Sequence, residues 1–372
     1  MTSNAQKNET EQLRLAIFSD SFPERNGAGA YYSDLSEQLG PRIGGVKVFQ
    51  PLVKKRLLWL AMPLPGDKTQ KILTPNIFRI NREFKAFKPH LCIAVTPGPF
   101  GMVGLWLAKR KKTGFLTAFH THFEGLVQMY GDTLFFRFCN WYLELINKIL
   151  IKRSESVLIN NEGLIPTVQR LGAKHQDLMG TPLASPFLNT PTVPPRGELK
   201  RVIFAGRLAP EKNLPVVIEA VRAFPSIEFV MVGEGPLRKE MEREAESLPN
   251  LSLTGWLDRE GLLAEIDQSD LLILPSHAET FGTVALEAMA RGRPALVSAE
   301  AGIHEWKSLS EALFVLNTGK SIVEVFNELL ALPAETWRQK AEAARTAAVA
   351  LNDQTIDQWV EFVRKYAKQR DE

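Results

Sequence analysis

Short apolar runs alternate with longer amphipathic segments along the whole chain. The short runs are typical of buried strands in a parallel sheet, and the longer segments, with apolar residues every three or four positions, are typical of covering helices. The alternation therefore predicts an α/β fold built from βα units. We expect strands at Leu13–Phe18, Val46–Gln50, Leu91–Thr96, Phe115–His120, Ser156–Asn160, Arg201–Ala205, Glu228–Val232, Leu251–Thr254, Leu271–Leu274 and Ala295–Ser298, and helices in the first half at about Gly29–Leu39, Asn76–Phe87, Phe100–Lys111 and Thr133–Lys152.

A proline-rich segment, Thr181–Pro195, interrupts this alternation near the middle of the chain. Proline lacks an N–H group and disfavours helix, so the segment predicts an extended linker between two domains. From Pro333 onward the pattern is helical only, with candidate helices at Glu335–Leu351 and Gln354–Gln369. We expect an N-terminal domain at 1–185, a linker at 186–199, a C-terminal domain at 200–350 and a C-terminal helix at 351–372.

Composition and charge narrow the class of protein. The net charge of the 372 residues is only +3, which gives no reason to expect a nucleic-acid partner. The two cysteines, Cys92 and Cys139, lie in apolar contexts and are too few for a disulfide scaffold. Neither a secretory leader nor an apolar run long enough to span a bilayer is evident. We therefore expect a cytoplasmic protein.

Two carboxylates, Glu279 and Glu287, stand eight residues apart after the apolar run at Leu271–Leu274. Between them, Phe281-Gly282-Thr283 marks the entry into a helix. The first N–H groups of a helix and its dipole favour a bound anion such as a diphosphate. Carboxylates accept hydrogen bonds from paired hydroxyls, so the segment suits a sugar next to a diphosphate.

Two cations follow the strand expected at Arg201–Ala205. Gly206 ends the strand, and Arg207 and Lys212 lie in the loop before the next helix. An arginine binds phosphate oxygens in a bidentate manner and a lysine does so as a point charge. This pair would neutralise a diphosphate leaving group.

The Glu-x7-Glu and Gly-Arg-x4-Lys segments resemble the motifs of the retaining GT-B glycosyltransferases of family 4, most strongly from Arg201 to Glu305. The resemblance implies two Rossmann-like domains facing each other across a cleft, with a C-terminal helix crossing back to the first domain. It implies that Glu279 contacts the donor sugar and that Glu287 holds the ribose. It also implies that Arg207 and Lys212 grip the donor phosphates.

The same resemblance extends to further positions, where the match to the family motifs is less specific. Gly27 and Gly29 stand in a glycine-rich loop that would reach the donor, although Ala28 departs from the family pattern. Gly233 ends a strand near the nucleotide and is explained mainly by turn geometry. Trp256 follows the strand near which the base would bind, and packing at a domain rim explains it equally well.

His120 ends the strand at Phe115–His120, and His122 follows two residues later. By resemblance to the family, His120 faces the transferred sugar. A buried structural histidine and a zinc ligand are the alternatives, but no third zinc ligand is evident from spacing. The sequence also lacks an Asp-x-Asp pair, a Gly-x-Ser-x-Gly elbow and a P-loop. We therefore expect no metal and no cofactor.

These observations predict a hexosyltransferase that uses a UDP- or GDP-sugar as its donor substrate and retains the anomeric configuration. No nucleophile is assigned, because the family favours a front-face reaction in which the leaving phosphate deprotonates the acceptor. A non-catalytic nucleotide-sugar-binding protein is an alternative. The presence of all four residues Arg207, Lys212, Glu279 and Glu287 speaks against it.

The acceptor is predicted from two amphipathic segments. Lys54–Met62 joins a basic cluster to apolar residues, and Leu134–Arg153 is rich in aromatic residues and ends with two cations. Such segments suit a membrane interface, although burial against the sheet is the simpler explanation for the second. We favour a membrane lipid such as a diacylglycerol and peripheral contact with the cytoplasmic face of the membrane. A soluble or polysaccharide acceptor is the alternative, and the oligomeric state is not predicted.

Overall fold

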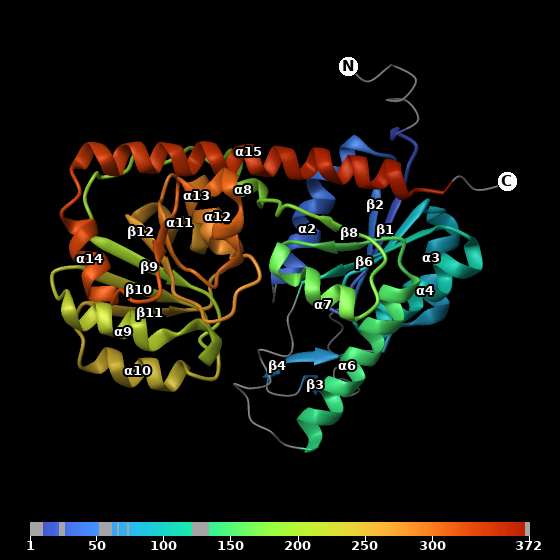
Figure 1. The fold of residues 1–372 in the computed structure, drawn as a ribbon, viewed down its shortest axis with the longest axis horizontal. Coiled ribbons are helices and arrows are strands. Elements are labelled where there is room, and N and C mark those ends of the chain that lie inside the picture. Colours follow the sequence, from blue (N-terminus) through green and yellow to red (C-terminus); the bar gives the residue numbers. More distant parts are fainter. Residues whose placement is uncertain are drawn as a thin grey trace. The chain divides into compact units, whose positions relative to one another are not determined.

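The computed structural model describes residues 10–21, 27–51, 62–64, 67–72, 74–120 and 134–368, which form two compact units. Unit 1 contains the described residues up to Pro182 and those from Asp353 onward. Unit 2 runs from Leu183 to Asn352. Each unit is built around a six-stranded parallel sheet flanked by helices (Figure 1). The predicted α/β fold with two Rossmann-like domains is confirmed.

The sheet of unit 1 has the strand order β2-β1-β5-β6-β7-β8. A separate antiparallel pair, β3 and β4, lies outside it. The elements of unit 1 are β1 Leu15–Phe18, α2 Gly27–Leu39, β2 Val46–Phe49, β3 Met62–Leu64, β4 Asp67–Ile72, α3 Ile77–Phe87, β5 Leu91–Ala94, α4 Pro99–Lys111, β6 Gly114–Phe119, α6 Leu134–Arg153, β7 Val157–Ile159, α7 Ile165–Arg170 and β8 Gln176–Leu178.

Burial on both faces explains why the strands of unit 1 are continuously apolar. Side chains of β1 alternate between two cores, with Leu15 and Ile17 in one and Ala16 and Phe18 in the other. The first core is completed by α2 and the end of α15, and the second by α3, α4 and α6. A strand with a core on each face must be apolar at every position.

The sheet of unit 2 has the strand order β11-β10-β9-β12-β13-β14. Its elements are α8 Ser185–Asn189, β9 Arg201–Ala205, α9 Leu214–Ala223, β10 Glu228–Val232, α10 Arg238–Glu246, β11 Leu251–Gly255, α11 Arg259–Gln268, β12 Leu271–Leu274, α12 Thr283–Ala290, β13 Ala295–Ser298, α13 Lys307–Ser310, β14 Phe314–Leu316, α14 Ile322–Leu330 and α15 Ala334–Tyr366.

The strand order of each sheet reverses once. In unit 1 the chain passes from β1 to β2 on one side and then returns to β5 on the other side of β1. In unit 2 it runs β9, β10, β11 and then returns to β12 on the other side of β9. The carboxyl ends of the two strands at such a reversal splay their loops apart, and ligands bind there in open α/β sheets. In unit 2, Arg207 and Lys212 follow β9 and Glu279 follows β12, whereas in unit 1 His120 follows β6, the neighbour of β5.

All ten expected strands are present. The antiparallel pair β3 and β4 was not predicted, and neither were two edge strands of the parallel sheets. These are β8 and β14, each of three residues and half-buried. Neither carries the long apolar run of a central strand, because an edge strand faces solvent along one side.

The prediction of an extended proline-rich linker is wrong at Ser185–Asn189, which form the short helix α8. Pro186 stands in its first turn, where a missing N–H costs nothing. Phe187 is fully buried in the core of unit 2. The buried guanidinium of Arg291 donates to the carbonyls of Thr190 at 2.6 Å and of Pro191 at 2.7 Å. This segment is therefore an integral part of unit 2.

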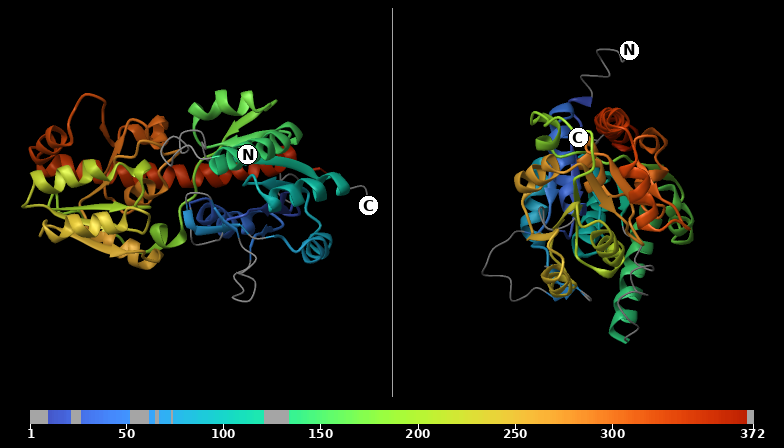
Figure 2. Two further views of the ribbon diagram at one scale, coloured as in Figure 1. Left: turned by 90° about the horizontal axis from the view of Figure 1, so that it is seen from below. Right: turned by 90° about the vertical axis from the view of Figure 1, so that its left-hand side faces the viewer.

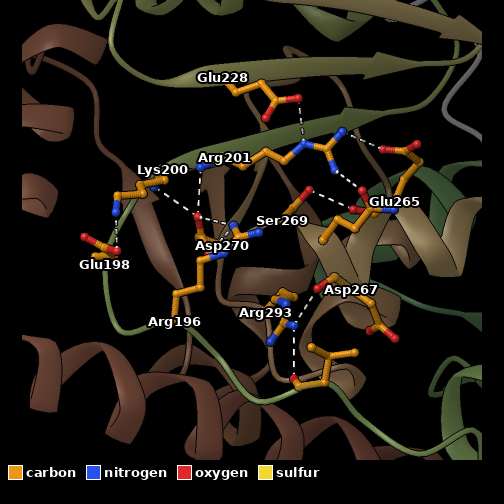
Figure 3. A network of polar contacts seen from close by, with 12 residues as sticks. Arg196, Glu198, Lys200, Arg201, Glu228, Glu265, Asp267, Ser269, Asp270 and Arg293 are labelled. Atoms are coloured by element: carbon orange, nitrogen blue, oxygen red, sulfur yellow. Dashed lines mark hydrogen bonds and ion pairs between the residues drawn. The ribbon is translucent and has the colours of Figure 1, made fainter.

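A polar network fixes the rest of the linker (Figure 3). Asp270 accepts hydrogen bonds from the backbone of Lys200 at 3.0 Å and of Arg201 at 2.8 Å, and pairs with Arg196 at 3.2 Å. Arg293 donates to the carbonyls of Val193 at 3.0 Å and of Asp267 at 2.7 Å. These bonds hold the chain before β9 against the loop before β12.

The two helices expected at the C-terminal end are one helix, α15. Trp337 and Leu351 of its first part belong to the core of unit 2. Trp359 and Val363 of its last part belong to the core of unit 1. The chain thus returns to its first unit through this helix, as the resemblance implied.

Candidate active site

The loops that follow β9 and β12 meet at the reversal point of the sheet of unit 2. Lys212 forms an ion pair with Glu279, and both side chains are largely buried. The backbone N–H of His277 donates to the carbonyl of Glu211 at 2.9 Å. Two residues predicted from separate motifs, 67 positions apart, are therefore brought into contact.

Arg207 lies in the same loop and pairs with Glu211 at 3.2 Å. The side chain of Glu211 is only 8% exposed and stands in a short 3-10 turn, Pro210–Lys212. Asn213, with a φ of 52°, ends that turn and starts α9. Glu211 was not predicted as a site residue. No local signal could have identified it, because Arg207 lies in a loop, where a spacing of four residues does not by itself bring two side chains together.

Glu279 is fixed on its other side by the segment after β13. The N–H of Gly302 donates to the carbonyl of Glu279 at 3.0 Å, and that of Ile303 donates to the carbonyl of Phe281 at 2.8 Å. Glu279 and Ala301 also form an isolated parallel bridge. The backbone around Glu279 is thus fixed by hydrogen bonds both to the loop after β9 and to the segment after β13.

Helix α12 begins next to this carboxylate. Gly282 precedes it in the left-handed region, at a φ of +101°, and as a glycine it offers no side chain to cap the helix. The N–H groups of Thr283 and Val284 therefore suit an anion, whereas that of Ala285 donates to the carbonyl of Gly282 at 2.9 Å. Phe281 is buried and packs against Trp306, whereas Glu287 lies half-buried in the second turn of the helix.

The glycines at the ends of β9 and β10 allow their backbones to touch. A Cβ atom on Gly233 would lie 1.9 Å from the carbonyl oxygen of Gly206, and Gly233 has a φ of +139°. The N–H of Gly233 donates to the carbonyl of Gly255 at 2.8 Å. Trp256 follows Gly255 and is 57% exposed. Its contact with a base stays a prediction.

In unit 1, His120 directly follows β6 and is hydrogen-bonded to Tyr32 of α2. The Nε2 atom of His120 lies 2.7 Å from the hydroxyl of Tyr32. Tyr31 packs edge-on against the imidazole, and its own hydroxyl accepts from Nε1 of Trp359 at 3.0 Å. This aromatic cluster, which the sequence did not reveal, fixes the orientation of the His120 ring.

Burial lowers the pKa of His120 to about 4. The imidazole is therefore neutral at neutral pH, with one ring nitrogen bonded to Tyr32. A neutral imidazole in this position suits a hydrogen bond to a sugar hydroxyl, as the resemblance implies for His120. That role stays a prediction.

The remaining predicted positions of unit 1 are only partly described. The prediction that Gly27 and Gly29 stand in a loop is wrong, because α2 begins at Gly27 and both glycines lie in its first turn. His122 and the segment Lys54–Ala61 lie outside the described residues. Within the part of the chain that the structure describes, no three potential metal ligands gather. The expected independence from metals remains a prediction.

Asp20 is a further polar residue at this edge of the sheet that the sequence analysis missed. It follows β1 and accepts hydrogen bonds from the hydroxyl of Thr96 at 2.6 Å and from the N–H of Phe100 at 2.9 Å. Burial raises its pKa. Asp20 thereby caps the start of α4 and joins the loops after β1 and β5.

We expect His120 to make unit 1 less stable in mild acid. Because its folded pKa of about 4 lies below the ordinary 6.5, the unfolded chain binds the extra proton between these values. Stability is then lost as the pH falls from 6.5 to 4, by up to about 3 kcal/mol. Urea unfolding between pH 7 and pH 4 should show that His120→Gln lacks this loss. The exposed His277→Gln is the control, and parallel pH profiles of wild type and His120→Gln would contradict the expectation.

Comparison with known protein families gives a match in unit 2. Residues 191–347 match the family described as glycosyl transferases group 1. The sulfoquinovosyl transferase of Arabidopsis thaliana is 25% identical over 242 residues, which are 60% of this chain and 46% of that protein. The GDP-mannose-dependent alpha-(1-6)-phosphatidylinositol dimannoside mannosyltransferase of Mycobacterium tuberculosis is 31% identical over 145 residues, 38% of each chain. The chain thus spans less than half of either relative.

Similar solved structures cover nearly the whole chain. Sucrose-phosphate synthase from Thermosynechococcus elongatus has a TM-score of 0.68 at 17% identity, over 95% of this chain and 98% of that one. An Anabaena protein solved with UDP-glucose has a TM-score of 0.65 at 17% identity, over 95% of this chain and 100% of that one. These similarities confirm the predicted GT-B fold.

Proposed function

We propose that this chain, whose residues 191–347 are a glycosyl transferases group 1 domain within a GT-B fold, transfers a hexose from a nucleotide diphosphate sugar to an acceptor hydroxyl. The observation that carries the proposal is the convergence of Lys212, Glu279 and Arg207 at the reversal point of the sheet of unit 2. Two cations and the start of an uncapped helix suit a diphosphate, and a carboxylate beside them suits the sugar.

The chemistry we infer is a front-face displacement with retention. The bond between the anomeric carbon and the diphosphate oxygen breaks while the acceptor oxygen bonds to the same face of that carbon. The acceptor proton passes to an oxygen of the leaving phosphate. Arg207, Lys212 and the N–H groups at the start of α12 would stabilise the charge that develops on the diphosphate. Glu279 would orient the sugar hydroxyls, and no enzymic nucleophile is needed.

A thermal-shift screen tests donor binding. UDP, GDP, ADP and their sugar conjugates are added to the wild type, to Arg207→Ala and to the control Arg222→Ala, which removes an exposed arginine of α9. A ligand at about 100 times its Kd adds about 2.7 kcal/mol, which raises the Tm by several degrees. We expect one nucleotide class to stabilise the wild type and Arg222→Ala but not Arg207→Ala. If none of these ligands shifts the Tm, the proposed donor class is wrong.

A membrane lipid is the acceptor class that we propose, and helix α6 supports it. Trp141 is 56% exposed, and Tyr142 and Leu145 are exposed beside it. The N-terminal half of the helix extends away from the sheet of unit 1, whereas Leu150 and Ile151 near its other end are buried (Figures 1 and 2). Among the described residues, no helix is both long and apolar enough to cross a bilayer. Exposed aromatic side chains on an amphipathic helix suit its insertion into a membrane interface.

Flotation with vesicles of phosphatidylglycerol, at low salt, tests this membrane contact. We expect the wild type to float and Trp141→Glu/Leu145→Glu to float several-fold less, because the two carboxylates oppose burial in lipid. The control Ile77→Glu/Phe78→Glu removes two apolar residues from α3 that are at least as exposed, at 47% and 91%. Equal flotation of the α6 variant and the wild type would favour a soluble or polysaccharide acceptor.

A further inference from the structure

A hollow of about 820 Å³ lies in unit 1 at the N-terminal edge of β7 and β8. Its walls come from the end of α6, the segments before the two strands, and the end of α15. This is the edge of the sheet opposite to the carboxyl ends, which carry Asp20 and His120. The hollow is therefore separate from the candidate active site. Its lining includes Lys152, Arg153, Glu155, Lys174, Asp177 and Lys365.

Both acidic residues of the hollow are already engaged. Asp177 accepts hydrogen bonds from Ser156 at 2.6 Å and from Tyr366, and pairs with Lys365 at 3.1 Å. Burial alone would raise the pKa of Asp177, but these contacts hold it below its usual value. Glu155 pairs with Lys368 at 2.8 Å. Each carboxylate is therefore neutralised within the wall of the hollow.

Three cations of the hollow, in contrast, have no acidic partner among the residues that the structure describes. They are Lys152, Arg153 and Lys174, and all three are exposed. The aliphatic stem of Lys152 lies over Gly172, where an added Cβ would stand 2.9 Å from it. Gly172 thus leaves room for the stem of this lysine. The concave surface concentrates positive potential that the protein itself does not neutralise.

Helix dipoles explain only part of this charge. Lys152 and Arg153 stand in the last turn of α6, and Lys365 in the last turn of α15, where cations are favourable. Lys174, however, comes from the segment between α7 and β8. The cations without an acidic partner thus come from two separate parts of the chain and face one hollow, and such a set matches an anion with several oxygens.

We propose that this hollow binds a phosphate-bearing anion, held by Lys152, Arg153 and Lys174. The phosphate could come from a lipid headgroup or from a soluble phosphate compound, and the chemistry of recognition is the same for both. The proposal does not depend on the proposed glycosyl transfer, because none of these residues belongs to the candidate active site.

The test is calorimetric titration of the full chain with inorganic phosphate, together with flotation on vesicles of phosphatidylglycerol or phosphatidylcholine. The variant Lys152→Glu/Lys174→Glu reverses two charges of the hollow. The control Arg82→Glu/Lys85→Glu makes the same change of charge at exposed positions of α3, in the same unit. A third protein, Lys212→Ala, removes one of the cations that we propose for the donor phosphates at the candidate active site. Circular dichroism and the Tm without ligand verify that each variant is folded.

We expect the hollow variant to bind phosphate, or phosphatidylglycerol vesicles, about tenfold or more weakly than the control. Phosphate binding that persists in Lys212→Ala and is lost in the hollow variant assigns a soluble phosphate to the hollow. Vesicle binding that is lost in the hollow variant, without binding of free phosphate, assigns a lipid headgroup. The proposal is overturned if the hollow variant matches the control in both arms, or if Lys212→Ala alone abolishes binding.

Discussion

Replacing Lys212 with alanine is expected to lower kcat by about two orders of magnitude or more, with the largest loss at saturating donor. The ammonium group of Lys212 lies at the reversal point of the sheet, where the charge of the leaving diphosphate would develop. An interaction that strengthens as charge develops acts on the transition state rather than on the bound substrate. Initial rates with the donor identified by the nucleotide screen measure this effect.

Because Lys212 is paired with Glu279, the loss of kcat in Lys212→Ala has two causes, and a double variant separates them. Lys212→Ala also leaves Glu279 without its cation, so the double variant with Glu279→Gln should lose less than the sum of the two single losses. The control is Lys200→Ala, which removes a lysine from the ion pair with Glu198 in the same unit, where the lysine is 63% exposed. A kcat for Lys212→Ala within fivefold of that for Lys200→Ala would sink the proposed role of this cation.

Sequence pattern alone predicted the central strands well, for a physical reason. β1 has a core on each of its faces, so its residues form an unbroken apolar run that a periodic search detects. Edge strands such as β8 lack this property, because Gln176 and Asp177 are polar and half-buried. Their place in the sheet is decided by pairing with a neighbour rather than by composition.

The candidate site was predicted residue by residue, but not its contacts. Motif spacing selected Lys212 and Glu279, yet their ion pair depends on β9 and β12 being neighbours, which no local pattern encodes. The bond between Tyr32 and His120 likewise joins residues 88 positions apart. Tyr32 lies in an amphipathic helix and has the pattern of an ordinary core residue. Only the folded structure, which places its hydroxyl against His120, distinguishes Tyr32 from other core residues of this helix.

In the linker, the prediction from local composition was wrong because tertiary contacts determine the conformation. Its prolines predicted an extended chain, but Pro186 in a first helical turn is compatible with helix and Phe187 adds a buried anchor. The carbonyls of the following residues are then satisfied by the buried Arg291. Tertiary contacts, which are absent from the local sequence, decide the conformation there.

Gly233→Ala is expected to destabilise unit 2 by about 3 kcal/mol or more. The new Cβ would stand 1.9 Å from the carbonyl oxygen of Gly206, so one of the two backbones must move. The φ of +139° at this position adds strain for any residue with a side chain. Since Gly206 directly precedes Arg207, the displacement should also weaken donor binding. A fall in Tm of about 6–12 °C, with a reduced shift on adding the nucleotide, would be the measured result.

Gly319→Ala separates the two causes of this loss. Gly319 also has a left-handed φ, of +105°, but a Cβ there meets no atom within 4 Å. It should therefore cost only the backbone strain, about 1–2 kcal/mol, and leave the nucleotide shift intact. If both variants lose the same stability, the close approach of β9 and β10 contributes nothing, and Gly233 is required only for its dihedral angle. A larger loss for Gly233→Ala, accompanied by weaker nucleotide binding, means that the packing of these strand ends positions Arg207 for the donor phosphates.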